Sequence, residues 1–392
     1  MKKVAIFRNG EILENTGGPS GYLYILKSGL KRVNSNIQVI SFGKKSTHHV
    51  KKETVQKTNF ISIMMQELYS CISILFYHKK NGKRLYNLLK DFDVIHVHSV
   101  ENAYSLSKIR KLKADILLTP HRPEPFCQEA INILTNKYHV QYSFPLLKLI
   151  YIYVEAKAYK AVSGFIFPSK GAMNIYKRFP GFSKGRKGKE VQYVLTGVAD
   201  KASLYQKGKY RHRFSLNDDD KVLVYVGRHS SIKGYDRLKN NADFFQKNQI
   251  NLICAGEYDD QSIPQKKIWH ECGYIEDVYN LLGDADVVVV PNRNTYFDLI
   301  IIEALSMGKI VLSTNTGGNL DISRLCKGLI LFDTENEADF KEKLLKIFSL
   351  DCEKKTLLER QSREFYENYC TVEQFARNYI AAVEKIGEGN KN

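Results

Sequence analysis

The most informative stretch of the sequence is Val287-Val288-Val289-Val290, which is apolar at every position and is followed by Pro291. A strand with one wet face alternates apolar and polar residues, whereas a fully apolar run fits a strand that is buried on both faces. Strands of that kind occur in parallel sheets that are covered by helices. The stretch therefore predicts an α/β fold built on a parallel sheet.

Ten further short strand-like runs alternate with helical patterns on both sides of this stretch. They lie at 4–7, 37–41, 94–97, 116–119, 164–168, 191–195, 222–226, 250–255, 310–313 and 328–332. Because 392 residues suit two domains better than one, we expect two doubly wound parallel-sheet domains, 1–200 and 201–371. The join is expected within Asp200–Lys221, a basic segment with little apolar periodicity.

The two halves of the chain differ in charge. Residues 1–200 carry 32 Lys and Arg against 13 Asp and Glu, a net charge of +19, whereas residues 201–392 carry 27 against 29, a net charge of −2. A basic half suits an anionic partner, such as nucleic acid, an anionic membrane or a phosphorylated substrate, or it is a solvated surface. Nucleic acid is disfavoured, because the second half has no basic–aromatic interleaving and no docking motif.

The seven cysteines and the N-terminus bear on the compartment. The cysteines are scattered, without a CxxC pair, which fits reduced thiols in a cytosol and argues against disulfides or a zinc site. The apolar run Val4 to Phe7 is too short for a signal peptide. We therefore expect a cytoplasmic protein without a metal site.

The stretch Phe60 to Tyr77 has 18 residues and a single charge, Glu67, so that its length alone makes it a marginal candidate for a membrane span. Its apolar residues recur at the spacing of one helix face: Ile61, Met64, Met65, Leu68, Ile72, Leu75 and Phe76. This periodicity predicts an amphipathic helix that packs on a sheet. Contact with an anionic membrane is the alternative, because basic residues follow directly: Lys79, Lys80, Lys83 and Arg84.

Ligands of doubly wound sheets bind at the carboxyl ends of the strands, so the residues that follow each strand are candidates for a site. After the first strand, Gly17 and Gly18 precede a helical pattern, where they would let a ligand approach the backbone or form a plain tight turn. Their spacing is neither GxGxxG nor a Walker loop, which disfavours dinucleotide binding and ATP hydrolysis.

Two charged features follow strands of the second half. The loop Gly227 to Gly234 holds Arg228 and Lys233, and two cations at a strand end can bind a diphosphate and stabilise it as a leaving group, or they are solvated. Further on, Glu303 lies in an apolar helical setting, where a carboxylate needs a partner. The hydroxyl groups of a ribose or a neighbouring Lys would be suitable partners for this carboxylate.

Three segments match a known family in order and spacing. They are Val226-Gly227-Arg228…Lys233-Gly234, Glu303-Ala304-Leu305-Ser306-Met307-Gly308 and Thr316-Gly317-Gly318. With them the chain resembles the retaining family-4 glycosyltransferases of GT-B architecture, over essentially its whole length but specifically only in the second half. The resemblance implies two Rossmann-like domains that face a central cleft, with the acceptor bound by the first and a nucleotide sugar by the second.

Carried over position by position, the resemblance implies roles for single residues. Arg228 and Lys233 would bind the donor diphosphate, Glu303 the nucleoside ribose, and His121 would lie beside the transferred sugar. The glycines that would line the cleft for phosphate and sugar are Gly17, Gly18, Gly227, Gly317 and Gly318. The leaving phosphate would help to take the acceptor proton, and neither a metal nor another cofactor would be required.

One departure from the family concerns the donor sugar. The family has a second Glu eight residues before Glu303, where this chain has Thr295, and it has a small Gly where this chain has Asp298. Asp298 could replace the missing carboxylate in binding donor-sugar hydroxyls, because it lies one helical turn from Thr295. It could equally cap or charge a helix N-terminus.

The resemblance and the basic first half together suggest the acceptor. We expect a glycan acceptor, lipid-linked, in the synthesis of bacterial capsule, O-antigen or another surface polysaccharide at the inner face of the plasma membrane. A protein (adhesin) acceptor and a non-catalytic GT-B partner subunit are the alternatives, the second because of Thr295. A helix at 372–392 would pack back on the first domain, as in GT-B relatives.

Overall fold

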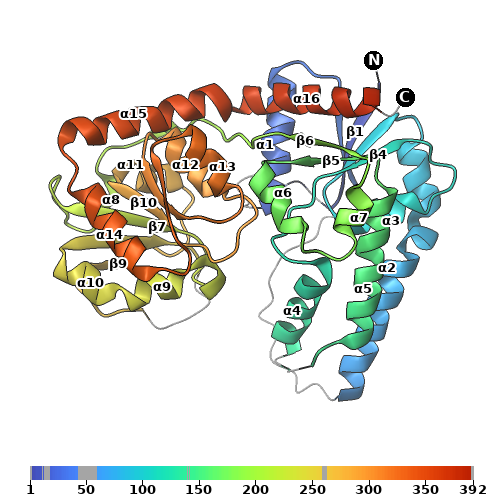
Figure 1. Ribbon diagram of the computed structural model, residues 1–392, viewed down its shortest axis with the longest axis horizontal. Coiled ribbons are helices and arrows are strands. Elements are labelled where there is room, and N and C mark those ends of the chain that lie inside the picture. The colour runs from blue at the N-terminus through green and yellow to red at the C-terminus, as the bar shows by residue number, and fades with distance from the viewer. Residues whose placement is uncertain are drawn as a thin grey trace. The chain divides into compact units, whose positions relative to one another are not determined.

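Figure 1 shows the protein as a computed structural model, which describes residues 2–10, 12, 18–42, 60–138, 140, 142–257 and 263–389. The chain divides into two compact units. Unit 1 comprises Met1–Phe167, Met173–Val194 and Ala376–Asn392, and unit 2 comprises Pro168–Ala172 and Leu195–Phe375. Each unit has its own parallel sheet.

The sheet of unit 1 has the strand order β2-β1-β3-β4-β5-β6, with parallel neighbours throughout. Its strands are β1 (Val4–Asn9), β2 (Gln38–Phe42), β3 (Val94–Val97), β4 (Asp115–Leu118), β5 (Gly164–Phe167) and β6 (Glu190–Tyr193). The strand order reverses between β1 and β3, and in such sheets the carboxyl ends of the two strands at this point border the ligand-binding crevice.

Helices surround this sheet. They are α1 (Gly18–Arg32), α2 (Phe60–Leu89), α3 (Val100–Ser107), α4 (Phe126–Tyr138), α5 (Pro145–Ala161), α6 (Lys170–Tyr176), α7 (Phe182–Arg186) and α16 (Val372–Gly389). The last helix belongs to unit 1 from Ala376 onward. Tyr379 and Ile386 are fully buried, and the Tyr379 hydroxyl lies 2.8 Å from His96 Nδ1. The C-terminal residues therefore form part of the core of unit 1.

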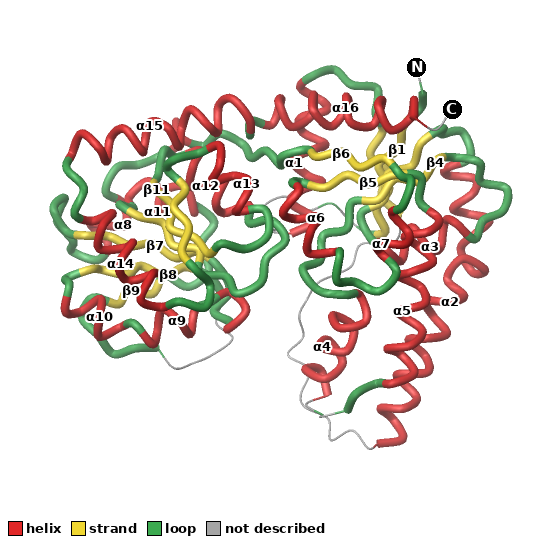
Figure 2. The backbone as a smooth tube through the Cα atoms, viewed as in Figure 1, coloured by secondary structure: helices red, strands yellow, loops and turns green. Residues whose placement is uncertain are grey.

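The sheet of unit 2 has the order β12-β11-β10-β7-β8-β9, again with parallel neighbours. Its strands are β7 (Lys221–Val226), β8 (Ile250–Ala255), β9 (Trp269–Glu271), β10 (Val287–Val290), β11 (Ile310–Thr314) and β12 (Leu329–Phe332). The order reverses between β7 and β10, which makes their carboxyl ends the expected binding crevice. Figure 2 shows the strands of each unit as one layer with helices around it.

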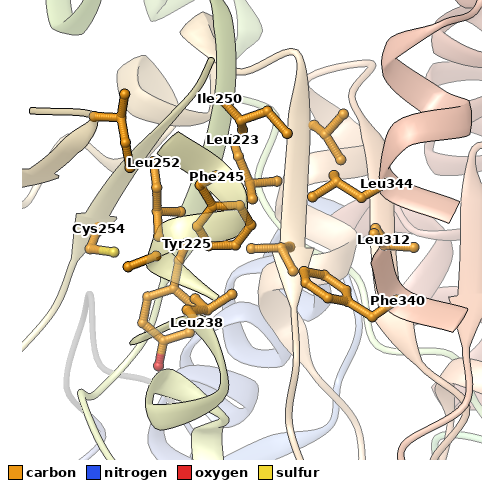
Figure 3. Packing of buried hydrophobic residues seen from close by; sticks show 14 of the residues in the cluster. Leu223, Tyr225, Leu238, Phe245, Ile250, Leu252, Cys254, Leu312, Phe340 and Leu344 are labelled. Carbon is orange, nitrogen blue, oxygen red and sulfur yellow. The ribbon is translucent and has the colours of Figure 1, made fainter. Parts of the chain in front are cut away.

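The helical elements of unit 2 are mostly short. They are η1 (Ala202–Leu204), α8 (Lys209–Arg213), η2 (Ser231–Lys233), α9 (Tyr235–Asn240), α10 (Ala242–Lys247), α11 (Val278–Asp284), α12 (Leu299–Ser306), α13 (Asn319–Leu325), α14 (Glu337–Phe348) and α15 (Cys352–Tyr369). On one face of the sheet, Leu223 and Leu312 pack against Phe245 of α10 and against Phe340 and Leu344 of α14 (Figure 3). All four valines of β10 are buried, as a strand between two helical layers requires.

These two parallel sheets with flanking helices confirm the predicted α/β, doubly wound fold. All eleven expected strands are present, and β9 is a strand that the sequence analysis missed. It has only three residues, and two of them, His270 and Glu271, are polar and half-buried. Such a short edge strand lacks the apolar run on which the other predictions depended.

The expectation for the helix at Phe60 was wrong in one respect. The apolar stripe does not pack on a sheet, because its large residues are exposed: Ile61, Met64, Met65, Leu68, Ile72 and Phe76. The buried side of α2 instead carries Ile63, Glu67 and Cys71, which face the cluster around Phe144 and Leu147 near the start of α5. Glu67 is satisfied there, because its carboxylate accepts hydrogen bonds from the Leu147 amide (2.8 Å) and the Tyr142 hydroxyl (3.2 Å).

Candidate active site

The loop that follows β7 lies against the end of β10. Gly234 has a φ of +71°, and a Cβ there would lie 2.1 Å from the Pro291 carbonyl oxygen, so that no other residue fits without a shift. The Arg293 amide donates a hydrogen bond of 3.0 Å to the Ile232 carbonyl. The loop with the two predicted cations is therefore held at the crevice between β7 and β10.

Lys233 and Asp298 meet at this crevice. The Lys233 Nζ lies 3.4 Å from Asp298 Oδ1, which also accepts a hydrogen bond of 2.6 Å from the side-chain nitrogen Nδ2 of Asn292. Asp298 is buried, and its second oxygen, Oδ2, has no hydrogen-bond partner among the described residues. A buried carboxylate oxygen without a donor is costly, so that it is available to a hydroxyl group of a ligand.

The alternative role of Asp298 as a helix cap does not fit this geometry. Asp298 occupies the N-cap position of α12, but its side chain makes no capping hydrogen bond. Its carboxylate is used by Lys233 and Asn292 instead. The side chain therefore takes part in the crevice and does not cap the helix, while its charge still lies at the N-terminus of α12.

Thr295 and the two glycines after β11 form a second contact of this site. Gly317 has a φ of +53°, and a Cβ there would lie 2.2 Å from the Thr295 carbonyl oxygen. The Gly318 amide donates a hydrogen bond of 3.1 Å to the Tyr296 carbonyl. Thr295 itself is buried. The structure thus brings together Thr295, Gly317 and Gly318, but it uses the Gly318 amide within the protein, so that this donor is not free for a phosphate.

Glu303 lies on α12 and is half-buried. Its carboxylate has no hydrogen-bond partner among the described residues. Burial raises the pKa of Glu303, and the charge of Lys201 opposes that rise. Lys201 forms no ion pair with Glu303 among the described residues, so the carboxylate can accept hydrogen bonds from a ligand.

Arg228 and Gly227 stand at the open side of the loop after β7. The Arg228 side chain is exposed and forms no ion pair within the described part of the chain, while its carbonyl accepts a hydrogen bond of 2.8 Å from Tyr225. The Gly227 amide is bound to the Ala255 carbonyl at 2.9 Å. Among the described residues, Arg228 is thus a cation without an ion-pair partner, whereas the Gly227 amide is already used.

In unit 1, the predicted residues fall at the end of β4 and the start of α1. His121 lies 3.0 Å from His98, measured from Nε2 to Nδ1, and burial together with Arg122 and Arg8 lowers the pKa of His121 to about 3. His121 is therefore neutral at physiological pH. Gly18 has a φ of +65° with open space where a side chain would lie, and Gly17 lies outside the described residues.

A cavity of about 480 Å³ opens beside His121, within unit 1. Most of its lining lies at or just after the ends of three strands: Arg8 and Asn9 at the end of β1, His98 to Asn102 after β3, and Pro120 to Glu124 after β4. The charged members of this group, Arg8, Glu101, Arg122 and Glu124, were not predicted from the sequence. A search for polar residues after every strand would have found them, because all three strands end at the crevice.

A metal site is not visible in the part of the chain that the structure describes, where no group of three or more His, Cys, Asp and Glu could hold an ion. His96 and His98 are used otherwise. His96 lies between the Tyr379 hydroxyl and the Thr119 hydroxyl, at 2.8 Å from each, and Thr119 donates onward to the Ile166 carbonyl. His96 is therefore a structural residue.

Two family models match the chain, one on each half. Glycosyltransferase Family 4 matches residues 16–186, and the model for glycosyl transferases group 1 matches residues 220–349. The O-antigen biosynthesis glycosyltransferase WclY of Escherichia coli is 22% identical over 79% of this chain and 84% of its own length. An uncharacterized 42.6 kDa protein from the cps region of Klebsiella pneumoniae is 24% identical over 82% of this chain and 88% of its own length.

Solved structures share the fold. Sucrose-phosphate synthase from Thermosynechococcus elongatus superposes with a TM-score of 0.67 at 16% identity, over 98% of this chain and 99% of its own. HepE from Anabaena, in complex with UDP, superposes with a TM-score of 0.64 at 12% identity, over 98% of this chain and all of its own. With both halves matched by glycosyltransferase models and both sheets arranged as in these neighbours, the chain belongs to the glycosyltransferases of GT-B fold.

Proposed function

We propose that this glycosyltransferase moves a sugar, with retention of anomeric configuration, from a nucleotide sugar to a lipid-linked glycan acceptor in the synthesis of a bacterial surface polysaccharide. The observation that carries the proposal is the pair formed by Lys233 and Asp298 between β7 and β10. The pair offers a cation for a phosphate and a carboxylate oxygen for a sugar hydroxyl. The relatives from O-antigen and cps regions support the class of product.

The donor binds to unit 2 in this proposal. Arg228 and Lys233 bind the diphosphate, Glu303 accepts hydrogen bonds from the ribose hydroxyls, and Asp298 Oδ2 accepts one from the transferred sugar. The UDP bound to HepE supports a nucleotide donor. Because two side-chain cations meet the diphosphate, a divalent metal ion is not needed to balance its charge.

The reaction breaks the bond between the anomeric carbon and the diphosphate oxygen. The acceptor hydroxyl oxygen bonds to the same face of that carbon, and its proton passes to the oxygen of the leaving diphosphate. Arg228 and Lys233 lower the barrier because negative charge builds up on the diphosphate as the bond breaks. His121, which is neutral, lies beside the sugar in this proposal without adding a charge there.

The donor step is tested by the melting temperature of the purified protein with UDP-, GDP- and dTDP-sugars. One nucleotide class should raise it, since a ligand at 100 times its Kd adds about 2.7 kcal/mol to the free energy of unfolding. Arg228→Ala and Lys233→Ala should each abolish most of that rise. Lys354→Ala, an exposed cation on α15, is the matched control and should keep it. No rise with any of the three classes would contradict the proposal.

The acceptor side of the proposal rests on α2. Among the described residues, this helix alone is long and apolar enough to cross a membrane. Only 17% of its most apolar window is buried in the protein, so most of that window is exposed. One side of the helix packs on α5. Its exposed apolar face is followed by the exposed cations Lys79, Lys80 and Lys83. An apolar face beside lysines fits the surface of an anionic bilayer, where a lipid-linked acceptor is presented.

Vesicle sedimentation tests this docking. The protein should sediment with vesicles of phosphatidylglycerol and phosphatidylcholine and less with phosphatidylcholine alone, and salt should weaken the binding. Met65→Ser with Ile72→Ser should release it, and so should changing the three lysines to Ala. Leu345→Ser, an exposed leucine of unit 2, is the control for lost apolar surface and should change nothing. Binding that ignores both salt and these changes would contradict docking through α2.

A further inference from the structure

The cavity of unit 1 has a charge that its surroundings would not predict. Four acidic side chains line it, Glu101, Glu124, Glu129 and Glu155, against two guanidinium groups, Arg8 and Arg122. Burial raises the pKa of Glu155 to about 7, so that this side chain is only partly ionised at neutral pH, and the other three still outnumber the two cations. Residues 1–200 carry a net charge of +19. The cavity is thus a locally acidic site inside a strongly basic half of the chain.

Arg122 is already neutralised within the protein. It forms two parallel hydrogen bonds with Glu101, of 3.0 and 2.8 Å, and also contacts Glu129. Burial alone would raise the pKa of Glu101, but Arg122 outweighs it and lowers that pKa, so that Glu101 is ionised at neutral pH. The Ser99 side chain and the Glu101 backbone amide also donate to this carboxylate, so that Glu101 is a firmly held, ionised acceptor in the lining of the cavity.

The histidines of the cavity add no charge. Burial, with the neighbouring histidines and Arg8, lowers the pKa of His98 well below its ordinary value, and the pKa of His121 is about 3. His98 is buried, and its Nε2 has no hydrogen-bond partner among the described residues. The cavity therefore contains a buried polar group that the described protein atoms leave unsatisfied, in addition to its acceptor oxygens.

From this lining we infer that the cavity binds an uncharged, polyhydroxylated ring, the acceptor sugar, and that it excludes phosphate and carboxylate groups. The inference rests on the proposed function and names the class of the acceptor. Its volume of about 480 Å³ lies within the range of small-molecule sites. Sugar hydroxyls can donate to the carboxylates and accept from Arg8, whereas an added anion would meet more negative than positive charge.

The same lining divides the acceptor into two parts. The sugar that is extended enters the acidic cavity, and any pyrophosphate or lipid headgroup stays on the basic exterior, where Lys79, Lys80 and Lys83 are exposed. The net charge of +19 of residues 1–200 thus reflects the outer surface that binds the anionic part of the acceptor. It does not apply to the cavity that binds the reacting sugar.

Matched pairs of methyl glycosides test the inference on the full-length protein. Hydrogen exchange is measured in the segments 98–102 and 120–129 with the methyl glycosides of glucose, galactose and N-acetylglucosamine, and with charged counterparts, methyl glucuronide, methyl galacturonide and methyl glucoside 6-phosphate. Neutral glycosides should protect these segments, with a Kd at least about tenfold lower than that of their charged partners. Stronger binding of the charged partners, or no protection by any neutral glycoside, would overturn the inference.

A variant sharpens the result. Glu124→Gln keeps the shape of the cavity but removes one negative charge, so that the preference for the neutral glycoside should fall several-fold. Glu190→Gln, an exposed residue of β6, should leave it unchanged. The donor test separates the two proposals: a nucleotide sugar that raises the melting temperature while no neutral glycoside binds refutes the cavity and leaves the proposed function standing.

Discussion

Unit 1 and unit 2 have sheets of the same kind but sites of different construction. In unit 2, the candidate residues lie in three short segments, 227–234, 291–303 and 317–318, which fold against each other through contacts such as Gly234 on Pro291 and Gly317 on Thr295. In unit 1, the cavity takes its residues from the ends of three strands and from helices such as α4 and α5, which are far apart in the sequence. A donor nucleotide is shared by many enzymes and suits a compact motif, whereas an acceptor differs from enzyme to enzyme and suits a site assembled from scattered residues.

The largest expected effect separates the two units by kinetic parameter. Asp298→Ala and Lys233→Ala should each lower kcat by about 10²–10³-fold, because they remove charges that act on the reacting sugar and the leaving group. Glu101→Gln should instead raise the KM for the acceptor, because it weakens a contact to a bound hydroxyl. Steady-state kinetics with varied donor and acceptor measure both. If the variants of both units lowered kcat equally, the assignment of donor chemistry to unit 2 and of acceptor binding to unit 1 would be contradicted.

A second test compares an ion pair of each unit. Arg122→Ala should lower the free energy of unfolding by about 3 kcal/mol, because Glu101 and Glu129 would keep their charges in a half-buried cavity without a partner. Arg324→Ala in unit 2 should change it by less than about 0.5 kcal/mol, since its pair with Asp321 is exposed. Urea unfolding gives both values. Similarly small decreases in the free energy of unfolding for the two variants would mean that water already screens the charges in the cavity.

A third test uses pH. Burial raises the pKa of Glu155 to about 7, against hydrogen bonds from Tyr159 and the Phe126 amide that favour its ionised form. The folded protein therefore keeps this proton where the unfolded chain, with an ordinary value of 4.5, has released it. Stability should fall as the pH rises from 5 to 7, by about 2 kcal/mol relative to Glu155→Gln. Parallel stability curves for the two proteins would contradict the raised pKa.

The smallest expected effect concerns metal ions. Incubation with EDTA followed by desalting should change the rate of transfer by less than about twofold, because Arg228 and Lys233 supply the positive charge at the diphosphate. The assay is repeated with added Mg²⁺ as the control. A loss of activity that Mg²⁺ restores would assign the diphosphate charge to an ion instead of the two side chains.

Sequence patterns predicted the parts of the molecule that depend on local chemistry. The buried strands were found because an apolar run of four to six residues has few other uses, and the cations of the loop 227–234 were found because a strand end precedes them. The role of Asp298 was left open between binding a sugar and capping or charging a helix, and its pairing with Lys233 was not predicted. That pairing depends on how two loops pack in space, which residue spacing does not reveal.

The wrong prediction that the apolar face of α2 packs on a sheet has a different cause. Periodicity shows that Ile61, Met65, Leu68 and Ile72 share a face, but it does not show whether protein covers that face. A single carboxylate, Glu67, lies on the packed side, where the Leu147 amide and the Tyr142 hydroxyl satisfy it. The charge of the cavity could not be predicted from the sequence either. Arg8, Glu101 and Arg122 belong to no recognisable motif, and only the folded sheet brings them together.

The position of α16 has a consequence for biosynthesis. Tyr379 and Ile386 fill the core of unit 1, and the Gly387 carbonyl accepts a hydrogen bond of 2.8 Å from Lys2. Residues 4–194 therefore keep part of their apolar surface uncovered during synthesis until residues 376–387 have left the ribosome and packed. A stop codon just before Ala376 would thus damage unit 1, although all the strands of its sheet would have been made.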